Sequence, residues 1–166
     1  MCSDKYTLRL SNVSHSENSN LVTLNSDLSE YTVRIPEFLR KKGKCKLTVQ
    51  NCVIQVKNAN GTSVVPANTH TAVVEVDGLN LLGYSNQNGA GPISLCELPI
   101  DSAKNDITLI NQLTYTCLDI APEITIKRKC YKSTTPFLPV AMAEQDTDVV
   151  PMILSLSLEF EEDMKK

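Results

Sequence analysis

The sequence predicts one all-β domain over residues 1–166, a single jelly-roll, two-sheet antiparallel sandwich of about eight to ten strands. Three observations lead to this prediction. Apolar and polar residues alternate with a period of two in one segment after another, and no segment sustains a helical period over three turns. The length of 166 residues suits one domain with one core. An immunoglobulin domain is smaller and carries a core Trp, whereas this chain has no Trp.

Within each clear strand segment, apolar residues alternate with polar ones, so one face is apolar and the other polar. These segments are residues 6–10, 31–35, 72–76, 109–117, 124–130 and 154–160. A longer segment, residues 44–57, changes phase, because its apolar residues are odd-numbered up to Val49 and even-numbered from Cys52. A bulge near Gln50 and Asn51 would return both halves to one core.

Weaker strand signals are found at residues 21–24, 79–82 and 93–98. Residues 36–42 predict a helical turn with Pro36 at its first position. The connections are polar or contain Gly and Pro, as loops do, and they are residues 11–20, 58–61, 86–92 and 133–139.

The six cysteines are predicted to be unpaired. No secretion signal is recognised at the start of the chain, and zinc ligands normally come as closely spaced pairs, which are absent. Cys45 and Cys52 lie in one predicted strand, about 20 Å apart, and cannot bridge each other. We therefore expect reduced thiols, with Cys45, Cys52, Cys117 and Cys130 largely buried.

No catalytic constellation stands out, and the chain is not expected to be an enzyme. His15 and His70 are predicted to lie in polar loops, without a second ligand at metal-binding spacing. There is no GxSxG elbow and no phosphate-binding loop. We expect no catalytic residue, no cofactor, no metal and no small-molecule substrate.

Two basic clusters allow two interpretations: residues 40–46, and Lys127, Arg128 and Lys129 with Lys132. They could form a patch for nucleic acid, a membrane surface or an acidic protein. Alternatively, they are a soluble turn and the solvent face of a strand, which we favour because charge runs commonly mark solvation. Nucleic-acid or membrane contact is thus left open but not indicated.

The segments 30–36, 46–54 and 153–160, together with the basic turn between the first two, resemble single jelly-roll capsid proteins of large eukaryotic double-stranded DNA viruses. The resemblance implies a structural role in the virion capsid. Such proteins form five-fold rings, as pentons at icosahedral vertices, or act as minor or cement proteins around the major capsid protein. It implies a homopentamer, with major and minor capsid proteins as further partners, assembled in the host cytoplasm.

A ring needs lateral contacts, and an apolar run in the last long loop is the candidate interface: Phe137, Leu138, Val140 and Met142. The same run could instead fold over one end of the sandwich. The rival from another class is a carbohydrate- or receptor-binding jelly-roll module. The low aromatic content of 5% disfavours sugar stacking. Glu144, Asp146 and Asp148 lack the glycine and distal Glu of an EF-hand calcium loop.

Overall fold

The computed structural model describes residues 3–11, 22–24, 30–57, 61–63, 65, 67–82, 94–101, 103–132, 139–141 and 152–161. These ranges contain ten strands and one short helix, and all strand pairs are antiparallel. The all-β prediction is confirmed. In chain order the elements are β1 (Ser3–Ser11), β2 (Val22–Leu24), β3 (Glu30–Arg34), α1 (Glu37–Arg40), β4 (Cys45–Gln55), β5 (Thr69–Leu81), β6 (Cys96–Pro99), β7 (Asp106–Thr108), β8 (Leu113–Lys132), β9 (Pro139–Ala141) and β10 (Met152–Glu161).

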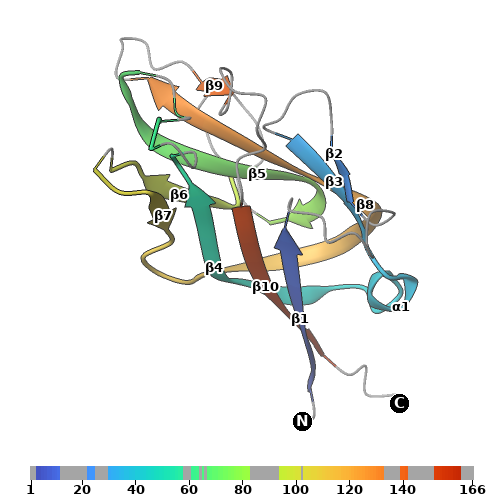
Figure 1. The fold of residues 1–166 in the computed structure, drawn as a ribbon. Helices are drawn as coiled ribbons and strands as arrows, with labels where there is room; N and C mark the ends of the chain where they lie inside the picture. Colours follow the sequence, from blue (N-terminus) through green and yellow to red (C-terminus); the bar gives the residue numbers. More distant parts are fainter. Residues whose placement is uncertain are drawn as a thin grey trace, which may run out of the picture.

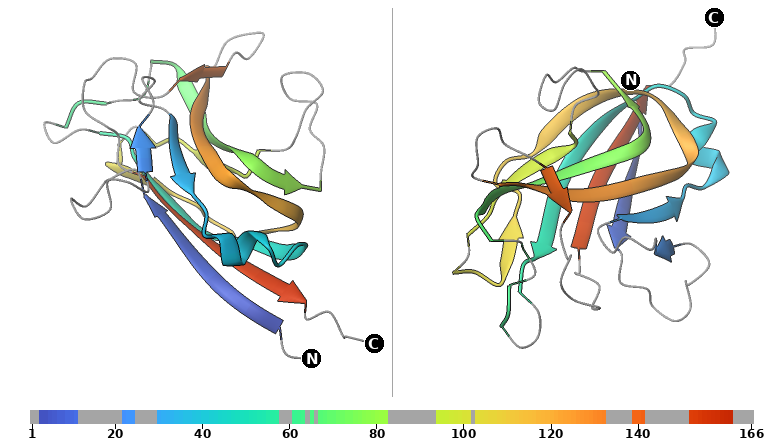
Figure 2. Two further views of the ribbon diagram at one scale, coloured as in Figure 1. Left: turned by 90° about the vertical axis from the view of Figure 1, so that its right-hand side faces the viewer. Right: turned by 90° about the horizontal axis from the view of Figure 1, so that it is seen from above.

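The strands hydrogen bond into one continuous sheet that folds over into two facing layers (Figures 1 and 2). The first layer has the order β1-β10-β4, followed by the first part of β8. The second has the order β2-β3, the later part of β8, β5 and β6. The apolar side chains of both layers face inward and form one core, which includes Leu47, Ile54, Leu98, Ile126 and Leu156.

The first and last strands lie side by side, as expected for a rolled sandwich. β1 pairs with β10 in unbroken register, from Ser3 opposite Glu161 to Ser11 opposite Ile153. β10 is therefore an inner strand of its layer, with β1 on one side and β4 on the other.

The predicted bulge in β4 is also present. Ser155 of β10 lies opposite Asn51, and the next residue, Leu156, lies opposite Val49. Gln50 is thus the extra residue, and it restores the core-facing parity of Cys52 and the apolar residues after it.

β8 differs from the prediction of two separate strands, because it runs unbroken for 20 residues through both layers. Its buried parity changes between Cys117 and Ile120, where the strand turns from one layer to the other. Pro122, which has no N–H to donate, lies in this bend, and its carbonyl accepts a 2.9 Å hydrogen bond from the Ile35 amide.

β5 follows the same bend, so the two segments predicted at 72–76 and 79–82 are one strand. The turn occurs at Gly78, whose φ is +98°. A Cβ atom there would lie 2.7 Å from the carbonyl oxygen of Glu123, so this position has room only for glycine.

The short elements are where sequence and structure differ most. The helix starts one residue later than predicted, at Glu37, with Pro36 as its N-cap. β7 was not predicted, and neither was β9. β8 begins at Leu113, so Leu109 precedes the strand rather than opening it.

Candidate functional site

The predicted interface run falls largely outside the described residues, which is the case for Phe137, Leu138 and Met142. Val140 lies in the three-residue strand β9, and its backbone is opposite Cys130 of β8. This part of the run is therefore attached to the edge of the second layer.

The basic cluster at residues 127–129 does not form a positive patch. The Nζ atom of Lys127 is 2.7 Å from Asp77, and that of Lys129 is 2.9 Å from Glu75. Both acidic residues lie on β5, directly beside β8. The charge that the sequence places on β8 is balanced by its neighbouring strand, as in the solvent-face interpretation.

Arg128 corrects that interpretation in one respect, because its side chain is completely buried. It has the same even parity as Ile124, Ile126 and Cys130, which all point into the core. The alternation along the strand indicated this position, whereas the charge run suggested solvent exposure.

Tyr31 is buried in the same core, and its hydroxyl has no hydrogen-bond partner among the described residues. Burial raises the pKa of this phenol far above its usual value, and the positive charge of Arg128 partly opposes that rise. A buried phenol and a buried guanidinium thus interact electrostatically between the two layers.

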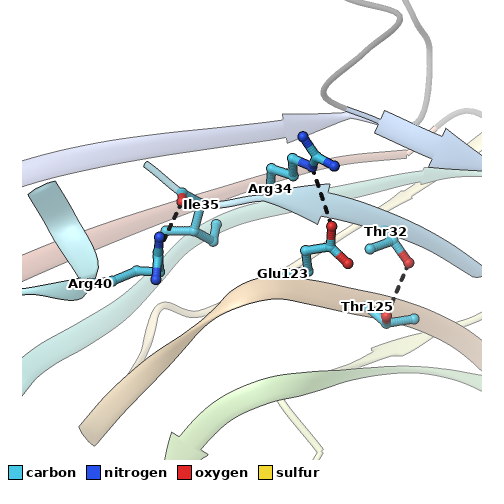
Figure 3. Close-up of polar contacts among 6 residues, drawn as sticks. All are labelled: Thr32, Arg34, Ile35, Arg40, Glu123 and Thr125. Atoms are coloured by element: carbon cyan, nitrogen blue, oxygen red, sulfur yellow. Dashed lines mark hydrogen bonds and ion pairs between the residues drawn. The ribbon is translucent and has the colours of Figure 1, made fainter. Parts of the chain in front are cut away.

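The other basic cluster, at residues 40–46, is also largely paired. Lys41 forms an (i, i+4) ion pair of 2.8 Å with Glu37, and Lys42 forms one of 2.7 Å with Asp4 of β1. The Nε atom of Arg40 donates to the carbonyl oxygen of Ile35 at 3.3 Å (Figure 3). Exposed ion pairs of this kind contribute little to stability. Lys44 and Lys46 are exposed as well, as expected for a solvated turn.

The outer face of the second layer shows similar local pairing (Figure 3). The hydroxyls of Thr32 and Thr125 are 3.0 Å apart across β3 and β8. Two register positions along, Arg34 Nε is 3.3 Å from the Glu123 carboxylate. These are cross-strand pairs that stabilise a sheet surface.

An aromatic cluster lies where β1 begins and β10 ends. Tyr6 contacts Phe38 of α1 at a ring-centroid distance of 5.7 Å and Phe160 at 6.1 Å, both edge-on. The ammonium of Lys42 is 5.2 Å from the centroid of the Tyr6 ring. Phe160 is buried, whereas Phe38 is 56% exposed, so the cluster extends from the core to the surface.

A surface pocket of about 680 Å³ lies beside this cluster, at the start of β4. Its chemistry is mixed, with lysines, hydroxyls and two carboxylates, so it has no single charge preference. The lining residues are Lys42, Gly43, Lys44, Cys45, Lys46, Thr114, Tyr115, Thr116, Glu159 and Glu161.

The thiol prediction is confirmed for the described residues. The five described cysteines form no disulfide and are buried, and they include all four that were predicted to be buried: Cys45, Cys52, Cys96, Cys117 and Cys130. Two of them, Cys45 and Cys117, lie directly opposite each other on β4 and β8. The interaction between these two thiols lowers the pKa of Cys45, and together with burial it raises the pKa of Cys117.

His70 lies in β5 rather than in a loop, where its Nδ1 atom is 2.7 Å from the Thr71 hydroxyl. Over the part of the chain that the structure describes, no three potential ligands among His, Cys, Asp and Glu gather at one place.

Among the described residues, no helix is long and apolar enough to cross a membrane. No protein-family profile matches the chain, and no curated protein is significantly similar to it in sequence.

Proposed function

We propose that this chain is a structural capsid protein of an icosahedral virus, a single jelly roll that assembles into a five-fold ring as the penton. Its partners would be further copies of itself and the major and minor capsid proteins of the virion. The observation that carries the proposal is the strand order of the two layers.

This order becomes clear when the two halves of β8 are treated as separate strands. Without the short strands β2, β7 and β9, eight strands then follow one another along the chain. One layer contains the first, eighth, third and sixth strands, and the other contains the second, seventh, fourth and fifth. Pairing of first with last and second with second-to-last supports a jelly roll, which arises when a long hairpin is rolled into two Greek keys.

The surface of the first layer also supports a role in assembly. The edge strand β1 and the adjacent α1 form one flank, from which the Phe38 ring projects. Closed rings need heterologous contacts, in which one flank meets a different surface of the next copy. Exposed aromatic residues are enriched at such interfaces.

The native mass of the purified protein over a concentration series tests the proposal. A species of five copies that dissociates on dilution is expected, with ring-shaped particles in electron micrographs. A monomer that binds the major capsid protein would indicate the minor or cement role instead. A monomer that binds neither capsid protein, but gives specific signals on a glycan array, would overturn the proposal in favour of a carbohydrate-binding module.

A double variant tests the predicted interface run. Phe137→Asp with Val140→Asp is expected to leave the domain folded, by circular dichroism, and to reduce ring formation. Assembly like the parent would exclude the run as a contact. Global unfolding would assign it to the core instead.

A further inference from the structure

Cys45 and Cys117 are the two cysteines that the strand register places directly opposite each other. Cys45 is the first residue of β4, and Cys117 lies in the first part of β8. Opposite residues of an antiparallel pair have Cα atoms about 4.5–5.5 Å apart, within the range that a disulfide requires. Both side chains point into the core, on the same face of the first layer.

The two thiols differ in their surroundings. Cys45 retains 3% of its exposure, whereas Cys117 is fully buried. Cys45 adjoins the pocket at the start of β4, but its side chain has the core-facing parity. The neighbours of Cys45 in the chain, Lys44 and Lys46, are exposed and line this pocket together with Glu159 and Glu161. The Cys117 sulfur, on the inner side, donates a 3.2 Å hydrogen bond to the Asp119 carbonyl oxygen.

We propose that Cys45 and Cys117 form an oxidation-sensitive dithiol, in which Cys45 reacts first with a hydroperoxide and Cys117 then completes a disulfide between β4 and β8. This inference goes beyond the proposed function and does not depend on it. It rests on the strand register and on the residual exposure of Cys45 at the start of β4.

The chemistry balances with hydrogen peroxide as the oxidant. The Cys45 thiolate attacks one peroxide oxygen, the O–O bond breaks and hydroxide leaves, giving a sulfenic acid on Cys45. The Cys117 sulfur then attacks the Cys45 sulfur, the S–O bond breaks, and the departing hydroxide takes up the Cys117 proton as water. The two thiols lose two electrons, and peroxide is reduced to water.

The position of the bond determines its structural effect. It would join β4 to β8 just before β8 turns into the second layer, so the start of the bend would be covalently attached to an inner strand. A cross-link between residues as far apart in the chain as Cys45 and Cys117 restricts the unfolded chain and raises the free energy of unfolding.

The test is peroxide treatment of the folded protein, followed by alkylation in denaturant without reductant and peptide mapping. We expect a linked peptide pair containing Cys45 and Cys117, and a melting temperature raised by roughly 5–10 °C that reductant reverses. In Cys117→Ala, a 1,3-dicarbonyl reagent should trap a sulfenic acid on Cys45. In Cys45→Ala, neither the cross-link nor a trapped Cys117 should appear.

Cys130→Ala is the matched control. Cys130 is equally buried on β8, but the residues opposite it are Ala72 and Val140, so it has no thiol in register. This variant should form the Cys45–Cys117 bond like the parent. The proposal is wrong if peptide mapping of the parent protein finds no Cys45–Cys117 bond at peroxide doses that oxidise its thiols. It is equally wrong if Cys52 and Cys96, two other buried thiols of the core, become linked first. A cross-link that lowers the melting temperature would overturn the stabilising role.

Discussion

At the scale of single residues, the interior of this protein contains polar atoms that a simple apolar core would lack. Arg128 and Tyr31 are both fully buried between the layers. The sequence pattern predicts the position of Arg128 if parity is followed through the whole strand. It does not predict the environment of Tyr31, because neither parity nor composition shows whether a buried hydroxyl finds a hydrogen-bond partner across the core.

Tyr31→Phe is expected to change the free energy of unfolding by less than about 1 kcal/mol, and in the stabilising direction. The reason is that a buried hydroxyl without a partner gains nothing from folding and loses its hydration. Tyr115→Phe is the matched control, because that hydroxyl donates a 2.7 Å hydrogen bond to the Leu95 carbonyl oxygen. It should cost about 1 kcal/mol. Urea unfolding of both variants measures the change in the free energy of unfolding. An equal loss of stability in the two variants would contradict the prediction.

The buried phenol also predicts a loss of stability at alkaline pH. Burial raises the pKa of Tyr31 in the folded state, whereas the unfolded chain titrates near its usual value of about 10. Above that pH the unfolded state releases the proton and the folded state keeps it, so stability falls as pH rises and is unaffected below it. Unfolding curves between pH 8 and pH 11, a range of about three units around this value, should show a smaller decline for Tyr31→Phe than for the parent.

At the scale of secondary-structure elements, the two long strands explain what the sequence could and could not predict. The apolar positions of β8 are evident on both sides of its bend, and so is their change of parity. A change of parity is compatible with a loop or with a continuous bent strand, and local pattern does not distinguish them. Gly78 and Pro122 are the residues that make the continuous strand feasible, and both types are also typical of loops.

Gly78→Ala is expected to cost several kcal/mol. It combines an unfavourable positive φ with a Cβ atom 2.7 Å from a backbone oxygen of β8, which has no flexible side chain to move. Gly61→Ala separates these two effects, because Gly61 has a φ of +77° and no atom within 4 Å of the added Cβ. That control should cost only about 1 kcal/mol. Thermal unfolding of both variants measures their loss of stability. A similar loss in the two variants would show that the close contact of the added Cβ with β8 at Gly78 has no effect.

Deletion of Gln50 should be tolerated, which is unusual for an inner strand. Removal of the bulged residue leaves Val49 opposite Leu156 and Asn51 opposite Ser155, and every core residue of β4 keeps its inward parity. Deletion of Thr48, two residues earlier, must turn part of the apolar face outward and should prevent folding. Near-ultraviolet circular dichroism of the two deletion variants compares them directly. Loss of structure in both would show that the bulge itself is required for the strand's curvature.

At the scale of the whole molecule, sequence patterns identify the fold class and the positions of most long strands, but not the strand order. A rolled two-layer architecture places the first and last strands side by side, which accounts for the pairing of β1 with β10. The division of the strands between the two layers depends on pairing between residues far apart in the chain, which local patterns do not show. The strands β7 and β9 are only three residues long, too short to give a clear alternation in the sequence.

The continuous course of β8 has a consequence for how the native state fluctuates. In sandwiches with separate sheets, one sheet can open while the other remains closed, and backbone amides then exchange with solvent deuterium at two distinct levels. Here both layers share one backbone, so opening of either must release part of β8. Its amides on the two sides of Pro122 should therefore exchange through a single global event, with equal opening free energies that match the free energy of unfolding. A lower opening energy on one side would show that the bend works as a hinge between two independent halves.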